Sequence, residues 1–571
     1  MKIFNIFTTL AHSLKRVTWT GILSLVLLTG IVYSNTLGVS AFIRDDCYII
    51  EANPFLGRWS ALPRLLTTGY WEASMGSAAP VKEYRPALML TYFLNCRIFG
   101  LSPRAFHLGN LLLQILNTIL LFILLRRSYG VEPAFTAAAL FAILPVHSEA
   151  VAYISGRSEL LVLFFMLLSW KALDPQKPRL AWGLASFAFA LLSKEQAILF
   201  PIFLAAADAC LYRVPFHLPP RRRVYFGLAG VAGLYLLLRQ AVLGHGLQAG
   251  RDYFSGAGYL TRLLTMSRFY FEHYLVPMVT GLRIQFDYAR PLIPDSTPAD
   301  AAAWLCLACW TALLAYSLCR AWKTRSRTAF WFLTAVLFLL PTGNLILKLD
   351  TLGADRFLYT SSVSFCVLAA LAVSRLRPLF RRTAVCAVLA WYSFISVKLN
   401  PVWAFQESFC KAALAGNPYS AKSIAQLGYE LWHKGELEPA IRQYDRALRL
   451  APDLTTAYYN LGSIYMEKGD LERAKLNFQK ALQYDPTDPD TWTCLGVVAE
   501  RLARPDVAGR CYTRAIELQD FNATARYNLA HLLLMGGHPA LARPHFEQFL
   551  RVAPDDPKAP AVRKLLAGLK V

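Results

Sequence analysis

The sequence predicts an all-α protein, in which a polytopic bundle of about eleven membrane-spanning helices is followed by an α-solenoid of helical repeats. Three observations carry this prediction. The 571 residues are 55% hydrophobic and only 17% charged, whereas soluble domains are about 25% charged. Apolar runs near the roughly 20 residues that cross a bilayer recur through the first 400 residues. The last 150 residues repeat with a period of 34.

The first predicted span is an uncleaved helix from about Trp19 to Val32, and the preceding Lys2, Lys15 and Arg16 place the N-terminus in the cytoplasm. The other ten predicted spans lie near residues 107–125, 132–148, 151–171, 180–193, 196–212, 224–243, 301–320, 328–347, 357–374 and 383–399. Lys and Arg gather at every second junction between spans, which is the alternation that the positive-inside rule produces. The apolar region before Ala421 holds 39 of the 59 basic residues and 19 of the 37 acidic ones. The high net charge therefore indicates membrane topology, and we expect no nucleic-acid partner.

These patterns predict a membrane domain over residues 1–400 and a linker over 401–420. Within the membrane domain, residues 38–106 form an outer loop, and residues 244–300 form an interfacial segment because Arg262, Glu272 and their charged neighbours interrupt its apolar run. With eleven spans, the C-terminal repeats lie on the same outer face as the first loop.

Four repeats are predicted over residues 421–556, with a capping helix over 557–571. Position 8 is small in every repeat, position 20 is always Ala, position 24 is always aromatic, and position 32 is Pro except at Asp520. This pattern resembles the tetratricopeptide repeat, in which small residues let two helices approach closely, the aromatic residue fills the gap to the next repeat and Pro ends the second helix. Such a superhelix presents a concave surface to a peptide, although a purely structural spacer has the same pattern.

Five polar clusters are predicted at the outer ends of the spans. They are Asp45-Asp46, Glu83-Tyr84-Arg85-Pro86, the run from His147 and Glu149 to Arg157 and Glu159, Lys194-Glu195, and Asp355-Arg356. Asp45-Asp46 alone is typical of a solvated loop end, and each of the other clusters alone is typical of a structural ion pair, but ionisable groups beside spans are costly unless they are paired or functional. Because all five lie on one side, we expect a single site there.

These motifs, together with Phe106-His107-Leu108-Gly109-Asn110 and Leu191-Leu192-Ser193, resemble the transmembrane and tetratricopeptide repeat (TMTC) family in order along nearly the whole chain. The resemblance implies a GT-C fold and an inverting glycosyltransferase that moves mannose from a polyprenyl phosphate to Ser or Thr. Two features depart from the family: the repeat array is short, and Ser148, Asp355 and Phe357 stand where the family's motifs have Thr, Glu and Tyr.

The resemblance also implies roles for individual residues. Asp45, Asp46 and Glu149 are the catalytic candidates, with Asp45 favoured as the base that deprotonates the acceptor hydroxyl. Arg85, Arg157, Lys194 and Arg356 are the candidates for binding the donor phosphate, since cations stabilise the leaving anion. The supporting candidates are His107, His147, Glu159, Glu195 and Asp355. A divalent metal, if one is used, would bind Asp45 and Asp46, but the chemistry does not require it.

The expected partners are the lipid-linked sugar, membrane lipid and an acceptor polypeptide held by the repeats. The compact array and the lack of a retention signal at Leu569-Lys570-Val571 favour a bacterial inner membrane with periplasmic repeats over the endoplasmic reticulum with luminal repeats. Three alternatives stay open: a non-enzymatic membrane-anchored scaffold for envelope assembly, sugar transfer to a glycolipid, and a transporter. A transporter would place its ionisable residues at mid-bilayer.

Overall fold

The computed structural model describes residues 2–75, 83–215, 218–244, 253–254, 256–288, 293–349 and 351–568. The described residues are mainly helical and include no strand, which confirms the all-α class. They divide into two compact units. The membrane unit comprises Met1–Cys47, Gly57–Thr68 and Glu83–Phe409, and the repeat unit comprises Tyr48–Leu56, Gly69–Lys82 and Cys410–Val571.

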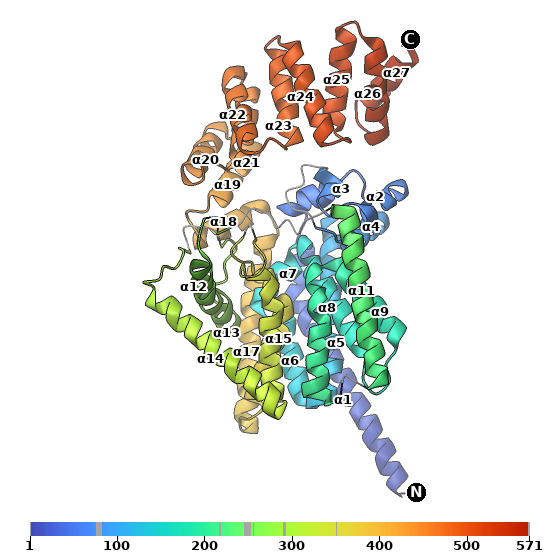
Figure 1. Ribbon diagram of the computed structural model, residues 1–571, viewed down its shortest axis with the longest axis vertical. Helices are drawn as coiled ribbons and strands as arrows, with labels where there is room; N and C mark the ends of the chain where they lie inside the picture. The colour runs from blue at the N-terminus through green and yellow to red at the C-terminus, as the bar shows by residue number, and fades with distance from the viewer. Residues whose placement is uncertain are drawn as a thin grey trace. The chain divides into compact units, whose positions relative to one another are not determined.

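Sixteen described α-helices make up most of the membrane unit (Figure 1). They are α1 (Lys2–Tyr33), α2 (Leu62–Thr67), α4 (Pro86–Phe99), α5 (Pro103–Tyr129), α6 (Val131–Ile143), α7 (Ser148–Ala152), α8 (Arg157–Ala172), α9 (Leu180–Ser193), α10 (Phe200–Ala207), α11 (Pro219–Leu243), α12 (Tyr259–Phe269), α13 (Val276–Thr280), α14 (Ala301–Thr324), α15 (Arg327–Leu339), α16 (Leu358–Val373) and α17 (Pro378–Leu399).

Seven of the described helices are long and apolar enough to cross a membrane, or eight if α6 and the Pro145–Ala152 segment, bent by 49° at Leu144, count as one. The chain is therefore an integral membrane protein, but the predicted number of eleven spans is not confirmed. The other three predicted spans correspond to α8, α9 and α15, which have 13 to 16 residues and are shorter than the roughly 20 residues of a typical span. The side chains of Lys2, Lys15 and Arg16 lie outside the described residues.

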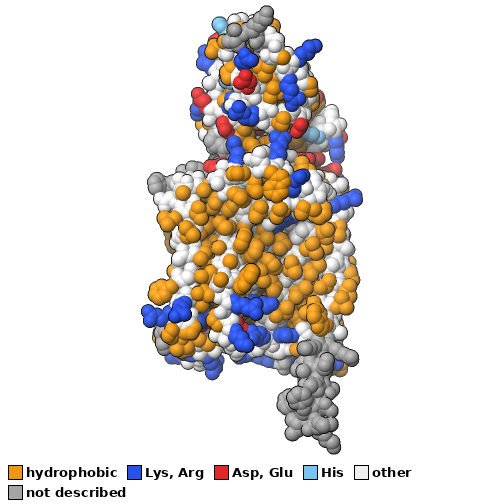
Figure 2. Space-filling model, turned by 90° about the vertical axis from the view of Figure 1, so that its right-hand side faces the viewer, with side chains coloured by type: hydrophobic (Ala, Val, Ile, Leu, Met, Phe, Trp, Pro, Cys, Tyr) orange, Lys and Arg blue, Asp and Glu red, His pale blue; other side chains and the backbone are white. Residues whose placement is uncertain are grey.

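The basic junctions of the membrane unit meet at one end of the bundle. Contacts across this end join Arg127 to Asp174, Arg327 to the Ser128 carbonyl, and Arg381 to Glu132. Figure 2 shows a broad band of hydrophobic side chains over this unit, with Lys and Arg along its lower border. The α5–α6, α8–α9, α14–α15 and α16–α17 junctions therefore share one end, as their charge predicts. The polar turns between the other helix pairs lie at the opposite ends of those helices.

The core of the membrane unit forms around α6. All residues from Thr136 to Ile143 in this helix are buried. Its Ala137, Ala138 and Ala139 are small, so neighbouring helices approach closely, which is the usual basis of helix association in a bilayer. The buried side chains of α1, α5, α8 and α16 join the same cluster. This central packing fixes the turns at both ends of α6.

The repeat unit consists of four helical pairs and a final helix, and α18 (Gln406–Gly416) spans the sequence boundary before it. Its helices are α3 (Glu72–Met75), α19 (Ala421–His433), α20 (Leu437–Leu450), α21 (Thr455–Glu467), α22 (Leu471–Tyr484), α23 (Pro489–Arg501), α24 (Pro505–Leu518), α25 (Ala523–Met535), α26 (Pro539–Val552) and α27 (Ala559–Gly568). The first helix of each pair begins at a predicted repeat start. In three repeats the aromatic side chain at position 24 packs directly against the Gly at position 8, where a Cβ would lie 2.5–3.1 Å from the ring. The aromatic residue thus fills a gap within its own repeat.

Candidate functional site

The Asp pair lies in a turn beyond the end of α1 that is held from three directions. The Arg44 amide donates to Gln406 Oε1 at 2.9 Å, the Asp45 amide donates to the Tyr153 hydroxyl at 3.1 Å, and the Ser155 amide donates to Asp46 Oδ1 at 3.0 Å. The Ser155 hydroxyl bonds the same oxygen. Arg44 has a φ of 52°, a left-handed conformation that is strained for a residue with a side chain. Such strain persists only where surrounding contacts impose it.

The two carboxylates differ in their surroundings. Asp46 is 1% exposed and accepts both hydrogen bonds from Ser155. Among the described residues, the Asp45 carboxylate makes no hydrogen bond, and only the backbone amide of this residue is fixed. Burial raises the pKa of Asp46 to about 8; the charge of Asp45 acts in the same direction, and the bonds from Ser155 oppose it. Asp46 is therefore an anchored carboxyl group, whereas the carboxylate of Asp45 is available to a ligand.

Glu149 and Arg356 form an ion pair beside Asp45. Glu149, in the first turn of α7, also accepts a hydrogen bond from the Arg356 amide at 2.9 Å. The Arg356 side chain is 27% exposed, and its charge interacts with those of both Glu149 and Asp45. The structure thus brings together three residues that lie in separate parts of the sequence: the carboxylates of Asp45 and Glu149 and the partly exposed guanidinium of Arg356.

Asp355, the neighbour of Arg356, is buried and accepts a hydrogen bond from the Tyr288 hydroxyl. The adjoining Ala354 is held at both its amide and its carbonyl by the Tyr274 hydroxyl, each at 3.2 Å. Aromatic residues from distant segments therefore fix the turn that presents Arg356.

Tyr153 completes this aromatic frame on the side of the Asp pair. Its ring stacks on Trp403 with centroids 5.2 Å apart, while its hydroxyl accepts from the Asp45 amide. Sequence reasoning missed Tyr153, Ser155, Tyr288 and Gln406, because neutral polar residues in an aromatic-rich chain give no signal of their own. The one available clue is that Tyr153 and Ser155 lie between the charged positions of the motif that starts at His147.

A second polar group contains Lys194, Glu195, Glu159 and Arg85. Lys194 forms a buried ion pair with Glu159, which also accepts from Gln196 Nε2 at 3.0 Å. Arg85 pairs with Glu83 at 2.7 Å and with Glu195 at 3.3 Å. The Lys194 charge interacts with those of both Arg85 and Arg356, so this group adjoins the Asp45 group. The structure therefore gathers ten of the twelve sequence-predicted residues into these groups and the packing directly behind them.

Arg157 and His107 lie apart from these groups. Arg157 is 2% exposed, and its guanidinium donates to Asn110 Oδ1 at 2.8 Å, to the Phe106 carbonyl at 2.7 Å and to Asn95 Oδ1 at 3.2 Å. His107 is buried beside it. These donors point at α4 and α5, so Arg157 joins helices and presents no free edge to a phosphate.

His147 lies directly behind the Glu149 turn, in the core. It is buried between the rings of Phe141 and Tyr359, with both centroid separations at 4.7 Å, and its Nε2 lies 2.7 Å from the Ser362 hydroxyl oxygen. This packing joins the turn that carries Glu149 to α16. We expect His147 to support that turn without contacting the substrate.

In the part of the chain that the structure describes, no three His, Cys, Asp or Glu side chains converge as metal ligands do. The only pairing relevant to the predicted metal is Asp45 with Asp46, and Asp46 Oδ1 is already bonded to Ser155. A metal at this position would need further ligands from its substrate or from water.

The buried Glu159–Lys194 pair leads to a stability prediction. We expect Glu159→Gln to lower the free energy of unfolding by about 3–5 kcal/mol, because it leaves Lys194 buried without a counter-charge. Glu159→Gln combined with Lys194→Met should recover part of this loss. A double-mutant cycle of thermal unfolding in detergent checks both expectations, and strictly additive losses would show that the two charges do not depend on each other.

The raised pKa of Asp46 predicts a pH-dependent stability. An unfolded Asp titrates near pH ~3.9, so between about pH 4 and pH 8 the unfolded chain loses a proton that the folded protein keeps. The stabilising contribution of the protonated carboxyl is full below this window and is lost as the pH rises to about 8. We expect Asp46→Asn, which is neutral throughout, to flatten the dependence of Tm on pH between about 5 and 8. Equal slopes for the two proteins in a pH series of thermal unfolding would contradict this.

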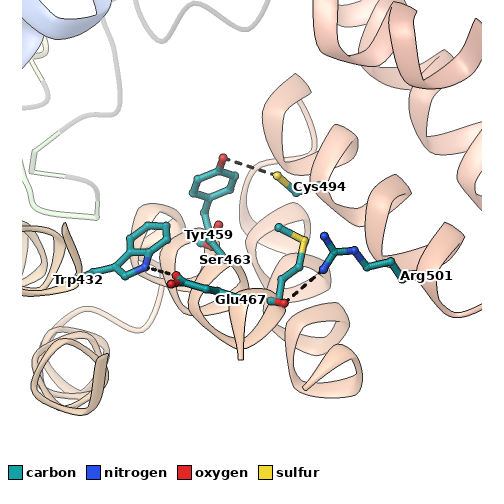
Figure 3. A pocket seen from close by; sticks show the side chains of 7 residues that line it. Trp432, Tyr459, Ser463, Glu467, Cys494 and Arg501 are labelled. Carbon is teal, nitrogen blue, oxygen red and sulfur yellow. Dashed lines mark hydrogen bonds between the residues drawn. The ribbon is translucent and has the colours of Figure 1, made fainter. Parts of the chain in front are cut away.

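The repeat unit has a pocket on the first helices of its first three repeats (Figure 3). Trp432 donates to Glu467 Oε2 at 2.8 Å on one side, and the Tyr459 hydroxyl lies 3.7 Å from Cys494 Sγ on the other. Arg501 closes the far end with a contact to the Met466 carbonyl at 3.5 Å. An indole, a phenol and a thioether together with two charged groups suit an extended peptide with mixed side chains.

Comparison with known proteins shows which proteins the chain resembles. Residues 85–218 match the model described as dolichyl-phosphate-mannose-protein mannosyltransferase, and residues 428–469, 455–488 and 495–563 match tetratricopeptide repeat models. The chain is 26% identical over 76% of its length to protein O-mannosyl-transferase F38B6.6 of Caenorhabditis elegans. It is 23% identical over 93% to human protein O-mannosyl-transferase TMTC3, and 28% identical over 71% to human TMTC4. The resemblance to the transmembrane and tetratricopeptide repeat family is confirmed.

The alignments cover 63%, 68% and 63% of these three relatives, respectively. The mannosyltransferase match includes Arg85, Glu149 and Lys194, whereas Asp45 and Arg356 lie outside it. The structure therefore joins residues within the matched segment to residues on either side of it. The site is therefore formed by residues from several parts of the membrane unit.

Proposed function

We propose that this protein is a membrane mannosyltransferase that moves mannose from a polyprenyl-phosphate carrier to Ser or Thr of an acceptor protein. The observation that carries the proposal is the Asp45 carboxylate, which is unbonded within the described residues and lies beside the Glu149–Arg356 pair. The matched mannosyltransferase model and the names of the TMTC relatives support the sugar, the donor class and the protein acceptor.

In the proposed reaction Asp45 removes the proton of the acceptor hydroxyl as its oxygen attacks the anomeric carbon. A C–O bond forms to the acceptor, the C–O bond to the lipid phosphate breaks, and its electron pair leaves with the phosphate. A single displacement inverts the anomeric configuration. The anchored Asp46 fixes the turn that aims Asp45, which is how a positioned base gains its efficiency.

The leaving phosphate needs cations whose donors are not all engaged within the protein. Arg356 meets this condition best, because its side chain is partly exposed and its charge reaches Asp45. Arg85, which pairs with Glu83 and Glu195 in the neighbouring group, is the second candidate by its position alone. We assign Lys194, which is buried against Glu159, to supporting this region, and Arg157, which is buried against Asn110, to joining helices. Arg can bind phosphate oxygens through two donors, which suits this role.

The test is mannose transfer by membranes that contain the full-length protein. Polyprenyl-phosphate-[³H]mannose is supplied, and label is followed in protein and in lipid extracts. We expect label in protein that alkaline β-elimination releases as mannose, and we expect the intact glycoside, before elimination, to have the anomeric configuration opposite to that of the donor. Label confined to lipid would instead indicate a glycolipid acceptor, and background label with mannose and other lipid-linked sugars would indicate a scaffold. Location in a bacterial inner membrane stays a prediction from the sequence.

The pocket in the repeat unit is proposed to bind the acceptor and so raise its concentration at the site. We expect Trp432→Ala to raise the KM for a protein acceptor about tenfold, because a large aromatic side chain in a binding pocket often contributes this much. The rate with a short hydroxyl-bearing peptide should not change. Leu541→Ala, which removes an exposed side chain outside the pocket, is the control. An unchanged KM in Trp432→Ala would exclude this pocket as the acceptor site.

A further inference from the structure

The segment that directly follows the Asp pair belongs to the repeat unit and not to the membrane unit. Tyr48–Leu56 and Gly69–Lys82 are parts of the first outer loop in sequence, yet both group with Cys410–Val571. Tyr48 is two residues from Asp46. A contact that fixes Tyr48–Leu56 therefore also restrains the Asp45–Asp46 turn, because very few residues separate the two.

Asn53 shapes the segment so that Phe55 projects from it. The Asn53 side chain donates to the Ile49 carbonyl at 3.1 Å and accepts from the Phe55 amide at 3.0 Å. Ile49 and Ile50 in the preceding π-helical turn are fully buried. The segment thus has a defined conformation of its own.

Two contacts join the outer loop to the junction between the third and fourth repeats. The ring of Phe55 meets that of Phe521 edge to face, with centroids 5.1 Å apart and planes at 80°. Gln519 Nε2 donates to the Ser74 carbonyl at 3.3 Å. The other end of the Gln519 amide accepts from Asn522 Nδ2 at 3.0 Å, and Asn522 in turn caps α25. The loop is therefore bonded to the start of a repeat helix.

This junction is where the array departs from its own repeat. Asp520 replaces the Pro found at position 32 of the other three repeats. At position 33 the other repeats carry exposed polar residues, namely Asp453, Thr487 and Asp555, whereas the third repeat carries Phe521, which is only 6% exposed. An aromatic residue at a position that repeat packing leaves in solvent needs another partner, and Phe55 provides one.

We propose that the third repeat junction is a docking site for the chain's own outer loop, and that Phe521 and Gln519 are positioning residues for the Asp45–Asp46 turn. The repeats thereby act on the rate of the reaction as well as on acceptor capture. The docking is independent of the proposed function, but its effect on turnover rests on it.

The test uses the full-length protein in detergent and two variants, each of which replaces one partner of the Phe55–Phe521 contact. Phe521→Asp restores the residue type of the first and fourth repeats, and Phe55→Ala removes the partner without touching the array. Thr487→Ala, at the equivalent exposed position of the second repeat, is the control. We expect amide hydrogen exchange of residues 48–56 to be about tenfold faster in both variants and unchanged in the control, since an aromatic pair with its buried area contributes a factor of this order.

The kinetic readout distinguishes positioning from capture. We expect kcat for mannose transfer to fall about tenfold in Phe521→Asp and in Phe55→Ala, with the KM for a protein acceptor unchanged. The double variant should be no worse than either single one. Exchange at wild-type rates in both variants would overturn the docking. Faster exchange with unchanged kcat would overturn the positioning role. If the wild type transfers no mannose, the proposed function fails, and the exchange measurement alone still decides the docking.

Discussion

Replacing Asp45 with Asn is expected to reduce mannose transfer by about 10²–10⁴-fold without loss of the folded protein. The size is that of a general base removed from a positioned site. The fold should survive because, within the described part of the chain, only the backbone amide of Asp45 is bonded, to the Tyr153 hydroxyl, and Asn keeps that amide. The measurement is the initial rate of labelled mannose incorporation at matched protein amounts, with Tm recorded for each preparation.

Asp46→Asn is the matched control for this experiment. It changes the adjacent residue in the same way, and its amide oxygen can still accept from Ser155. Burial raises the pKa of Asp46 to about 8, so this carboxyl is mostly protonated at neutral pH. Replacing it with the neutral amide of Asn therefore changes its charge little. We expect Asp46→Asn to retain most of its activity. An inactive Asp46→Asn beside an active Asp45→Asn would reverse the assignment of the base.

The gathering of Asp45, Glu149 and Arg356 could be predicted from the sequence because each lies where a span ends on the same side. That prediction needs only the alternation of basic and polar junctions along the chain. The direction of each side chain could not be predicted. Arg157 and Arg356 give the same signal, an Arg beside a span, yet Arg157 packs against Asn110 and Arg356 reaches Glu149.

The contacts that hold the site are long-range, which is why the sequence does not show them. The Asp45 amide donates to Tyr153, which is 108 residues away in sequence, and the Arg44 amide donates to Gln406, which is 362 residues away. A Tyr or Gln in an apolar chain is equally typical of the core. The number of eleven spans stays unconfirmed for a related reason, because hydropathy detects that α8, α9 and α15 are apolar but does not give their lengths of 13 to 16 residues.

The repeats were easier to predict, since four copies of one pattern reinforce each other. The same regularity makes exceptions informative. Asp520 and Phe521 break the pattern at one junction, and the structure places a loop from a distant part of the chain there. A departure from a repeat is thus a sequence signal for a contact that the repeat itself does not require.

The second large effect is expected at Gly156, in the turn between Ser155 and Arg157. A Cβ on this residue would lie 2.4 Å from the Ala150 carbonyl oxygen and 2.8 Å from its carbon. Both atoms belong to the backbone of α7, so no side chain can move aside to make room. We expect Gly156→Ala to lower the free energy of unfolding by about 1–3 kcal/mol, the usual cost of overpacking.

We expect Gly156→Ala to lose transfer activity while the protein stays folded. A backbone shift at this turn moves Ser155 and Tyr153 together, and these residues hold Asp46 and Asp45. A misplacement of about 1 Å in a catalytic group can cost 10²-fold in rate, so folded protein with about one hundredth of the wild-type transfer rate is the expected result. Gly230→Ala is the control, since a Cβ there meets nothing within 4 Å and Ala favours the α11 helix. If Gly156→Ala matches Gly230→Ala in both Tm and transfer rate, the turn is not what aligns the two carboxylates.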